Sequence, residues 1–416
     1  MSFATAETPG GNGSTVKGGA IVVLLLASSL TVLAGTLVAP GLPAMRIAFA
    51  AQPGADLLVR LVLTMHALGV VVGAPLAGLA IDRVGRRFVL LVGLLVYCLG
   101  GISGLWLPTL PLILAGRLVL GIGVAAVMVA ATTLIADLAS GEARGRLMGV
   151  QAAFMGLGGI VFMVLGGWLS DISWRWPFAV YAIGFGLVPA VLLALPADRP
   201  HVQTTQARVR LPRSVLLVSA AALVGMLFFY LVPVQLPFLL DHRMAADGMR
   251  IGLSLGLMTV VSSTSAFLYS RIQRRLGSAG VLVLTFAMMV PGLAVLGWAG
   301  SWSGVIAGLV VFGAAVGLLM PNSNLWTSQL VPASQRGKAL GFLTTAIFLG
   351  QLLSPLVTAP LLSAGVSLGR LFLVSAGAAG VVALGCIPVF LVGRPAGIKR
   401  PTPVVRHSSV HGREKS

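Results

Sequence analysis

The sequence contains very few acidic residues and few charged residues of any kind. Its 416 residues include 10 Asp and Glu, and charged residues make up 9% of the chain, against about 25% in an ordinary soluble domain. Hydrophobic residues make up 57%, and the mean hydropathy is +1.01. A water-soluble globule could not cover so much apolar surface with so few charges. The composition therefore predicts a chain embedded in lipid.

Cysteine is also scarce. Cys98 and Cys386 are the two cysteines, and both lie inside long apolar segments, so neither a disulfide framework nor a thiolate metal site is indicated. The sequence has no Gly-rich nucleotide loop, which leaves ATP-driven pumping unsupported. No cluster of nucleophilic or metal-ligating side chains indicates an enzyme. We expect a protein that is not an enzyme and that holds no cofactor and no metal.

The chain consists largely of continuous apolar segments. Within lipid, every backbone polar group must be bonded inside the protein, which leaves helices or a closed β-barrel. Barrel strands alternate polar and apolar residues over about ten positions, whereas these segments are about 20 residues long, the length of a helix that crosses a bilayer. We predict an all-α integral membrane protein. The twelve expected transmembrane helices lie at about 19–43, 58–80, 88–106, 109–136, 147–169, 177–195, 214–240, 251–270, 279–298, 303–330, 340–362 and 370–392.

The net charge of +18 is distributed unevenly along the chain. With both termini in the cytoplasm, 21 Lys and Arg fall on the cytoplasmic side and six outside, while Arg117 lies within a span. Cytoplasmic loops of membrane proteins collect Lys and Arg, so the bias predicts a multi-pass protein of the cytoplasmic membrane with both termini inside. No nucleic-acid partner is expected, because no soluble domain carries a basic face.

The two halves of the chain are similar in sequence. A shift of 192 residues aligns "AGRLVLGIGV" at 115–124 with "AGLVVFGAAV" at 307–316, and "RGRLMG" at 144–149 with "RGKALG" at 336–341. Internal repeats of this kind build secondary transporters from two bundles around a central site. The expected boundaries are a disordered cytoplasmic N-terminus (1–18), a six-helix bundle (19–195), a cytoplasmic loop (196–213), a second six-helix bundle (214–393) and a basic cytoplasmic tail (394–416).

The connection between the second and third spans, "GLAIDRVGRRF" at 78–88, concentrates charge. Its pattern G-x-x-x-D-R-x-G-R-R resembles the signature loop of the major facilitator superfamily, and the resemblance extends from about residue 19 to 393. Within that family the chain resembles the 12-span drug and metabolite efflux branch, which exchanges substrate for protons. The "GGIVFMVLGG" segment at 158–167 departs from that branch, because Phe162 and Met163 replace the usual Gly-Pro.

The resemblance implies a conformational latch at this loop. Asp82 would face the start of the eleventh span in the outward-open state, with Arg144 nearby, while the loop arginines can also meet lipid phosphates. At the position equivalent to Asp82 the second half has Arg274, so we expect a one-sided latch. A plain topology-setting loop is the alternative. The expected latch residues are Gly78, Asp82, Arg83, Gly85, Arg86, Arg87 and Arg144.

Several polar residues lie inside predicted spans. Arg117 has Leu309 as its repeat partner, and an intramembrane arginine usually faces a polar cavity; the resemblance implies substrate binding or proton relay. A structural arginine bonded to carbonyl groups is the alternative.

No acidic residue lies at mid-span, so His66 is the candidate proton carrier, with ordinary packing as its alternative. The resemblance places further pathway residues in spans seven, ten and eleven: Tyr230, Gln235, Asn322, Asn324, Trp326 and Gln351.

These features favour a secondary transporter that exports small amphipathic compounds or drugs by alternating access, coupled to protons. Aromatic side chains with a few amides suit an amphipathic solute. A sugar or metabolite permease stays open and would depend more strongly on Asn322, Asn324 and Gln235. A membrane sensor without transport is a third alternative, although the tail is short for a signalling domain. The expected partners are a small-molecule substrate, protons and membrane lipids, and a monomer suffices for this architecture.

Overall fold

The computed structural model describes residues 18–138, 141–196 and 211–392. Within these ranges the chain is helical and contains no strand. The predicted N-terminal and C-terminal segments and most of the predicted central loop lie outside the described residues. The first half comprises α1 (Gly18–Leu33), η1 (Ala39–Gly41), α2 (Leu42–Ala48), α3 (Ala55–Val84), α4 (Arg86–Ile102), η2 (Ser103–Leu105), α5 (Leu110–Asp137), α6 (Gly141–Ile172), η3 (Trp176–Ala182) and α7 (Ile183–Ala194). The second half comprises α8 (Arg213–Met244), α9 (Gly248–Trp298), α10 (Trp302–Gln329), η4 (Ala333–Gln335), α11 (Arg336–Ser363) and α12 (Leu368–Val392).

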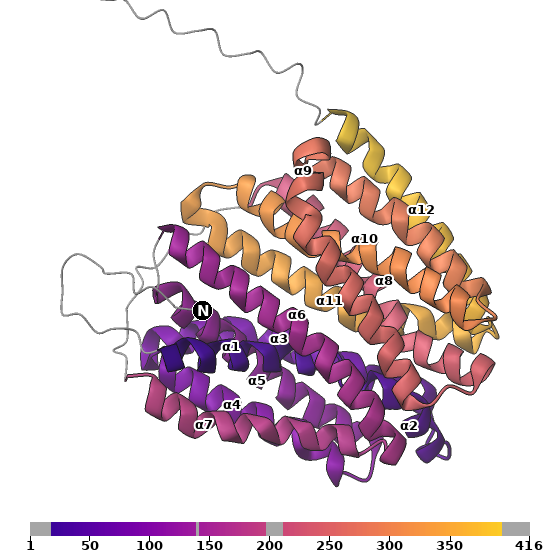
Figure 1. Ribbon diagram of the computed structural model, residues 1–416, viewed down its shortest axis with the longest axis horizontal. Helices are drawn as coiled ribbons and strands as arrows, with labels where there is room; N and C mark the ends of the chain where they lie inside the picture. Colours follow the sequence, from indigo (N-terminus) through magenta and orange to yellow (C-terminus); the bar gives the residue numbers. More distant parts are fainter. Residues whose placement is uncertain (1–17, 139–140, 197–210, 393–416) are drawn as a thin grey trace, which may run out of the picture.

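Ten helical segments among the described residues are long and apolar enough to cross a membrane. One of them, α9, contains two spans, because its backbone turns at Gly277 with φ 68° and ψ 172°. The short α1 continues through a turn into η1 and α2 and makes one more span. The arrangement therefore confirms twelve transmembrane helices, and Figure 1 shows the two halves side by side.

The backbone repeats the internal symmetry of the sequence. Gly277 lies 192 residues after Gly85, which has φ 88° and ψ 161°. Both positions reverse the chain between consecutive spans, and their positive φ favours glycine because it has no Cβ. Equivalent loops in the two halves therefore turn in the same conformation.

Helix packing repeats with the same spacing. In the first half, a Cβ on Gly121 would lie 2.0 Å from the carbonyl oxygen of His66, so α5 lies directly against α3. In the second half, a Cβ on Gly313 would lie 2.8 Å from the carbonyl oxygen of Met258, between α10 and α9. Glycine allows membrane helices to approach closely. The matched contacts, also 192 residues apart, confirm two pseudo-symmetric bundles.

The first span differs from the continuous helix that the sequence predicts. It is helical to Leu33, passes through a turn at 34–38 and resumes in η1 and α2. Gly35 lies in the turn, and Pro40 and Pro43 follow it. Proline has no N–H to donate to the preceding turn, and the carbonyl groups of Thr36 and Ala39 accept instead from the N–H groups of Ala39 and Leu42, in tighter turns. Such a break is tolerated in a membrane when it is buried in protein or lines a cavity.

The halves contact each other mainly at one end of the molecule. We call this end the outer face; the opposite end, which carries the 82–87 loop, is the inner face, in keeping with its predicted cytoplasmic position. At the outer face, Arg60 donates a hydrogen bond to the second half, and Asp171 accepts two from it. Polar contacts between the halves therefore close the outer face.

Candidate functional site

The break in the first span is stabilised by a buried arginine. Arg117 of α5 has 0% of its surface exposed. Its Nε donates to the Val62 carbonyl at 2.8 Å, and its guanidinium also donates to the Tyr181 hydroxyl at 2.7 Å and to the Ala34 carbonyl. The Tyr181 hydroxyl bonds to the Leu33 carbonyl at 3.4 Å. Arg117 thus binds the Ala34 carbonyl, which accepts no backbone hydrogen bond at the break, whereas the Leu33 carbonyl also accepts from the N–H groups of Thr36 and Leu37.

Two further sequence-predicted residues lie at this break. A Cβ on Gly35 would lie 2.6 Å from the Tyr230 hydroxyl and 3.4 Å from His66 Nε2. His66 belongs to α3 in the first half, and its Nδ1 lies 2.9 Å from the Leu63 carbonyl oxygen. Tyr230 belongs to α8, so both halves meet at the turn. The structure therefore brings Arg117, His66 and Tyr230 together around one segment, which we call the central turn (residues 34–38).

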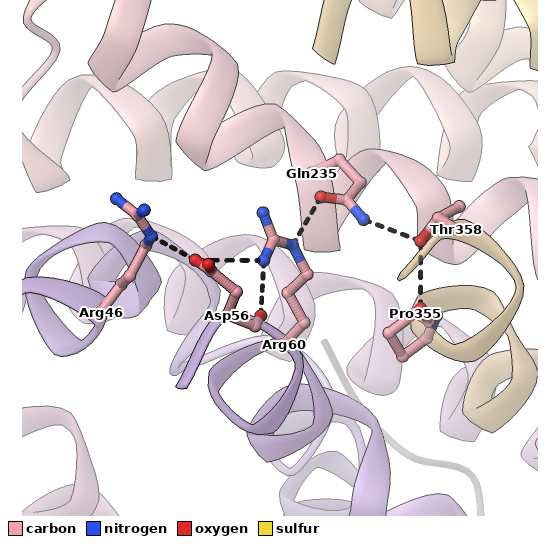
Figure 2. A network of polar contacts seen from close by, with 6 residues as sticks. All are labelled: Arg46, Asp56, Arg60, Gln235, Pro355 and Thr358. Atoms are coloured by element: carbon pink, nitrogen blue, oxygen red, sulfur yellow. Dashed lines mark hydrogen bonds and ion pairs between the residues drawn. The ribbon is translucent and has the colours of Figure 1, made fainter. Parts of the chain in front are cut away.

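A polar network closes the outer face between the halves (Figure 2). Arg60 of α3 has only 7% of its surface exposed; its Nε donates to Gln235 Oε1 of α8 at 2.9 Å, and its guanidinium lies 4.4 Å from the centre of the Phe238 ring. Gln235 Nε2 then donates to Thr358 Oγ1 of α11 at 2.9 Å. The network therefore links three helices across the interface. We call Arg60, Gln235 and Thr358 the outer latch.

Acidic residues extend the closure at the rim. Asp56 forms ion pairs with Arg46 and with Arg60, the latter at 3.8 Å. On the other side of the interface, the Asp171 carboxylate at the end of α6 accepts hydrogen bonds from the Gly248 N–H at 2.6 Å and the Met249 N–H at 3.0 Å. These amides begin α9, where unpaired N–H groups and the helix dipole favour an anion. The outer face is thus held by two separate groups of polar contacts.

The predicted latch residues of the 82–87 loop lie at the inner face, at the opposite end of the molecule from the outer latch. Arg86 forms an ion pair with Asp137 at 2.6 Å, and Arg87 donates to the Leu192 carbonyl at 2.7 Å, both within the first half. Asp82 is half-buried and Arg144 is exposed. Within the part of the chain that the structure describes, Asp82 makes no hydrogen bond or ion pair with α11. Gly78, Arg83 and Gly85 complete this loop, where Gly85 supplies the left-handed turn.

The remaining predicted pathway residues do not gather at the central turn. Asn322 is fully buried; it accepts from the Tyr269 hydroxyl at 3.2 Å and donates to the Ser278 carbonyl at 3.0 Å, which ties α10 to α9. Asn324 is exposed and Trp326 half-buried on the same helix. Gln351 of α11 is buried, and its Oε1 has no hydrogen-bond partner among the described residues.

Sequence reasoning missed three residues of the site. Arg60 was expected among the outside charges, but it lies within α3, buried against the second half. Its position inside an apolar span was the available signal, since intramembrane charges usually have a partner. Thr358 carried no comparable signal, because threonine hydroxyls in helices often bond to the preceding turn. Tyr181 carried none either, because tyrosine is common near the ends of membrane spans.

Comparison with known proteins agrees with this architecture. The family profile described as Major Facilitator Superfamily matches residues 24–278 and 217–412. The tetracycline resistance protein of class G from Vibrio anguillarum is 31% identical over 343 residues, covering 79% of this chain and 86% of that protein. The class C protein from Escherichia coli is 27% identical, covering 84% and 91%.

Solved structures show the same fold at lower sequence identity. A D-xylose-proton symporter shares 17% identity and has a TM-score of 0.73, covering 89% of this chain and 97% of that chain. A bacterial homologue of the human lysosomal transporter Spinster, in an inward-facing and occupied conformation, shares 14% identity and has a TM-score of 0.70, covering 92% and 96%. On the profile match, the similarity to the resistance proteins and the duplicated twelve-helix fold, the chain belongs to the major facilitator superfamily.

Proposed function

We propose that this chain exports small amphipathic drugs across the cytoplasmic membrane by alternating access, in exchange for protons. The observation that carries the proposal is the similarity to tetracycline resistance proteins over most of both chains. The closed outer face corresponds to a state that would load cargo from the cytoplasm. Tetracycline is therefore the first compound to test, together with other amphipathic compounds.

The polar contacts between the halves suit a carrier that must open and close repeatedly. Opening the outer face breaks the Arg60–Gln235 bond and the contacts between Asp171 and the start of α9. Water can replace each of these hydrogen bonds, so opening costs less than separating an apolar interface of the same area. In the opposite state, Asp82 and its neighbours in the 82–87 loop close the inner face against α11.

Proton coupling requires a group that gains and loses a proton during the cycle. The seven described acidic residues lie near helix ends, whereas His66 lies at the central turn, where both halves meet. We assign it the proton, because its site changes when the halves separate.

The sugar permease alternative would direct Asn322 and Gln235 toward a solute, yet both amides are engaged by protein groups.

Everted membrane vesicles with an acidic interior test this function. We expect tetracycline, or another amphipathic compound of a panel that includes sugars, to enter the vesicles and release protons. Asp82→Asn should reduce both signals to the level of vesicles without the protein, at an equal amount of protein in the membrane. Transport of sugars alone would contradict drug export, and wild-type flux in Asp82→Asn would contradict the inner latch.

A further inference from the structure

Arg117 places a positive charge in the middle of the first half without an acidic partner. Its three acceptors, the Val62 carbonyl, the Ala34 carbonyl and the Tyr181 hydroxyl, are all neutral. Neutral acceptors offset the loss of hydration in part, but they leave the net charge in place. In a low-dielectric interior such a charge acts over a long distance.

The acidic residues that the structure describes lie too near the membrane edges to neutralise it. Six of them are exposed, the seventh is half-buried, and each lies within about one turn of a helix end. These residues are Asp56, Asp82, Asp137, Glu142, Asp171, Asp241 and Asp247. The second buried arginine, Arg60, lies between the central turn and the outer face. Arg60 pairs with Asp56, so Arg117 is the uncompensated charge along this path of the described interior.

Arg117 also has unused hydrogen-bonding capacity. A guanidinium carries five N–H groups, and the three hydrogen bonds account for three of them. Two N–H groups therefore have no acceptor among the described residues. The arginine lies directly behind the central turn, whose Gly35 contacts Tyr230 of the second half and the His66 ring. The charge thus lies close to the surface that the two halves share.

We infer that the carrier selects amphipathic cargo bearing an anionic group, such as a carboxylate, sulfonate or phenolate, and that Arg117 determines this preference. The inference rests on the proposed export function and names its substrate class. An anionic group bound near the central turn balances the charge of Arg117, because the electric field of that charge extends across the turn. Tyr230 and His66 offer polar contacts to the same group. A cationic compound of equal size meets an unfavourable potential at this position.

Three dansyl compounds that share a fluorophore and differ in charge test the inference in everted vesicles. They are dansylglycine (anionic), dansylamide (neutral) and dansylcadaverine (cationic). We expect dansylglycine to accumulate about tenfold faster than dansylcadaverine, a difference that corresponds to about 1.4 kcal/mol. Arg117→Gln should remove the preference and Arg117→Lys should retain it. The matched control is Arg175→Gln, because Arg175 also donates to carbonyl groups, those of Gly104, Leu105 and Leu107, but at the outer end.

The outcomes separate the inference from the proposed function. Faster transport of dansylcadaverine, or equal loss of the preference in Arg175→Gln, would overturn the assignment to Arg117 while drug export stands. If neither tetracycline nor any amphipathic compound moves, the proposed export function itself fails. Size-exclusion profiles report whether each variant folds. If Arg117→Gln does not fold, inhibition of wild-type tetracycline export by the three compounds decides the charge preference.

Discussion

Replacing Gln235 with Leu should open the outer face. Leu is close to Gln in size but cannot accept the hydrogen bond from Arg60 Nε, which is 2.9 Å long in the closed state. A hydrogen bond to a charged group contributes about 1.5–3 kcal/mol, and a buried donor left without an acceptor costs a similar amount. The Thr358 hydroxyl still donates to the Ser354 carbonyl at 3.0 Å. The substitution therefore leaves one buried group, Arg60 Nε, without a hydrogen-bond partner. In the outward-open state Arg60 regains water, so the cost falls on the closed state.

The expected shift is measurable as a change in population. A destabilisation of about 1.4 kcal/mol changes the ratio of closed to open molecules about tenfold. Spin labels at Ala51 and Ala364, two exposed residues of opposite halves at the outer face, would report the distance between the halves. Cys98 and Cys386 are first replaced with Ser. We expect a larger long-distance component in Gln235→Leu than in the parent protein.

A buried amide within one half provides the control. Gln151 of α6 donates to Ser28 at 2.9 Å and to Thr132 at 3.2 Å, all within the first half. Gln151→Leu removes comparable hydrogen bonds without touching the interface, so the outer distance should stay as in the parent. An unchanged distance distribution in Gln235→Leu, or an equal shift in Gln151→Leu, would refute the reasoning.

Other substitutions test packing, the inner loop and proton coupling. Gly121→Ala should lower the melting temperature, because the added Cβ would lie 2.0 Å from the His66 carbonyl oxygen. Overpacking of this kind costs about 1–3 kcal/mol. Gly78→Ala should leave the melting temperature unchanged, because there is open space around Gly78. Reversing the charges of the Arg86–Asp137 pair in a double variant should restore the flux that either single reversal reduces, and a double variant as slow as the singles would contradict a functional pair. His66→Ala should make substrate flux independent of pH; an unchanged pH profile would exclude His66 as the proton carrier.

The sequence predicted the architecture because two of its signals are physically direct. Apolar segments of bilayer length can only be helices in lipid, and the 192-residue repeat fixed two equivalent bundles. The structure shows the same 192-residue repeat. Gly85 and Gly277 both have a positive φ, and Gly121 and Gly313 contact the equivalent carbonyl groups of His66 and Met258. The expected residue boundaries of the spans differ mainly where helices continue into loops.

The break in the first span could not be predicted from its prolines alone. Pro233 and Pro237 lie inside α8, and Pro355 lies inside α11, and these helices continue through them. The first span differs because Arg117 and Tyr181 supply donors to the carbonyl groups at its break. Those donors come from other spans, and their proximity depends on tertiary packing that the local sequence does not show.

The orientation of polar residues was equally hard to predict. Spans seven and ten have no distinct polar face, so their sequences do not show which side faces the other half. Gln235 was expected in the cargo pathway and lies in the outer latch, while Asn322 is used to tie α10 to α9. Arg60 was counted among the outside charges because it lies near a span end, and its bond to Gln235 of α8 shows that it also faces the second half.

Locking the outer face tests alternating access most directly. Asp171→Cys and Met249→Cys place thiols on opposite halves, where Asp171 now bonds to the Met249 N–H at 3.0 Å. A short, cleavable bifunctional thiol reagent would join them in everted vesicles. The account predicts that the joined protein exports no tetracycline or other cargo and that cleaving the link restores the flux. Undiminished export by the joined protein would contradict the account.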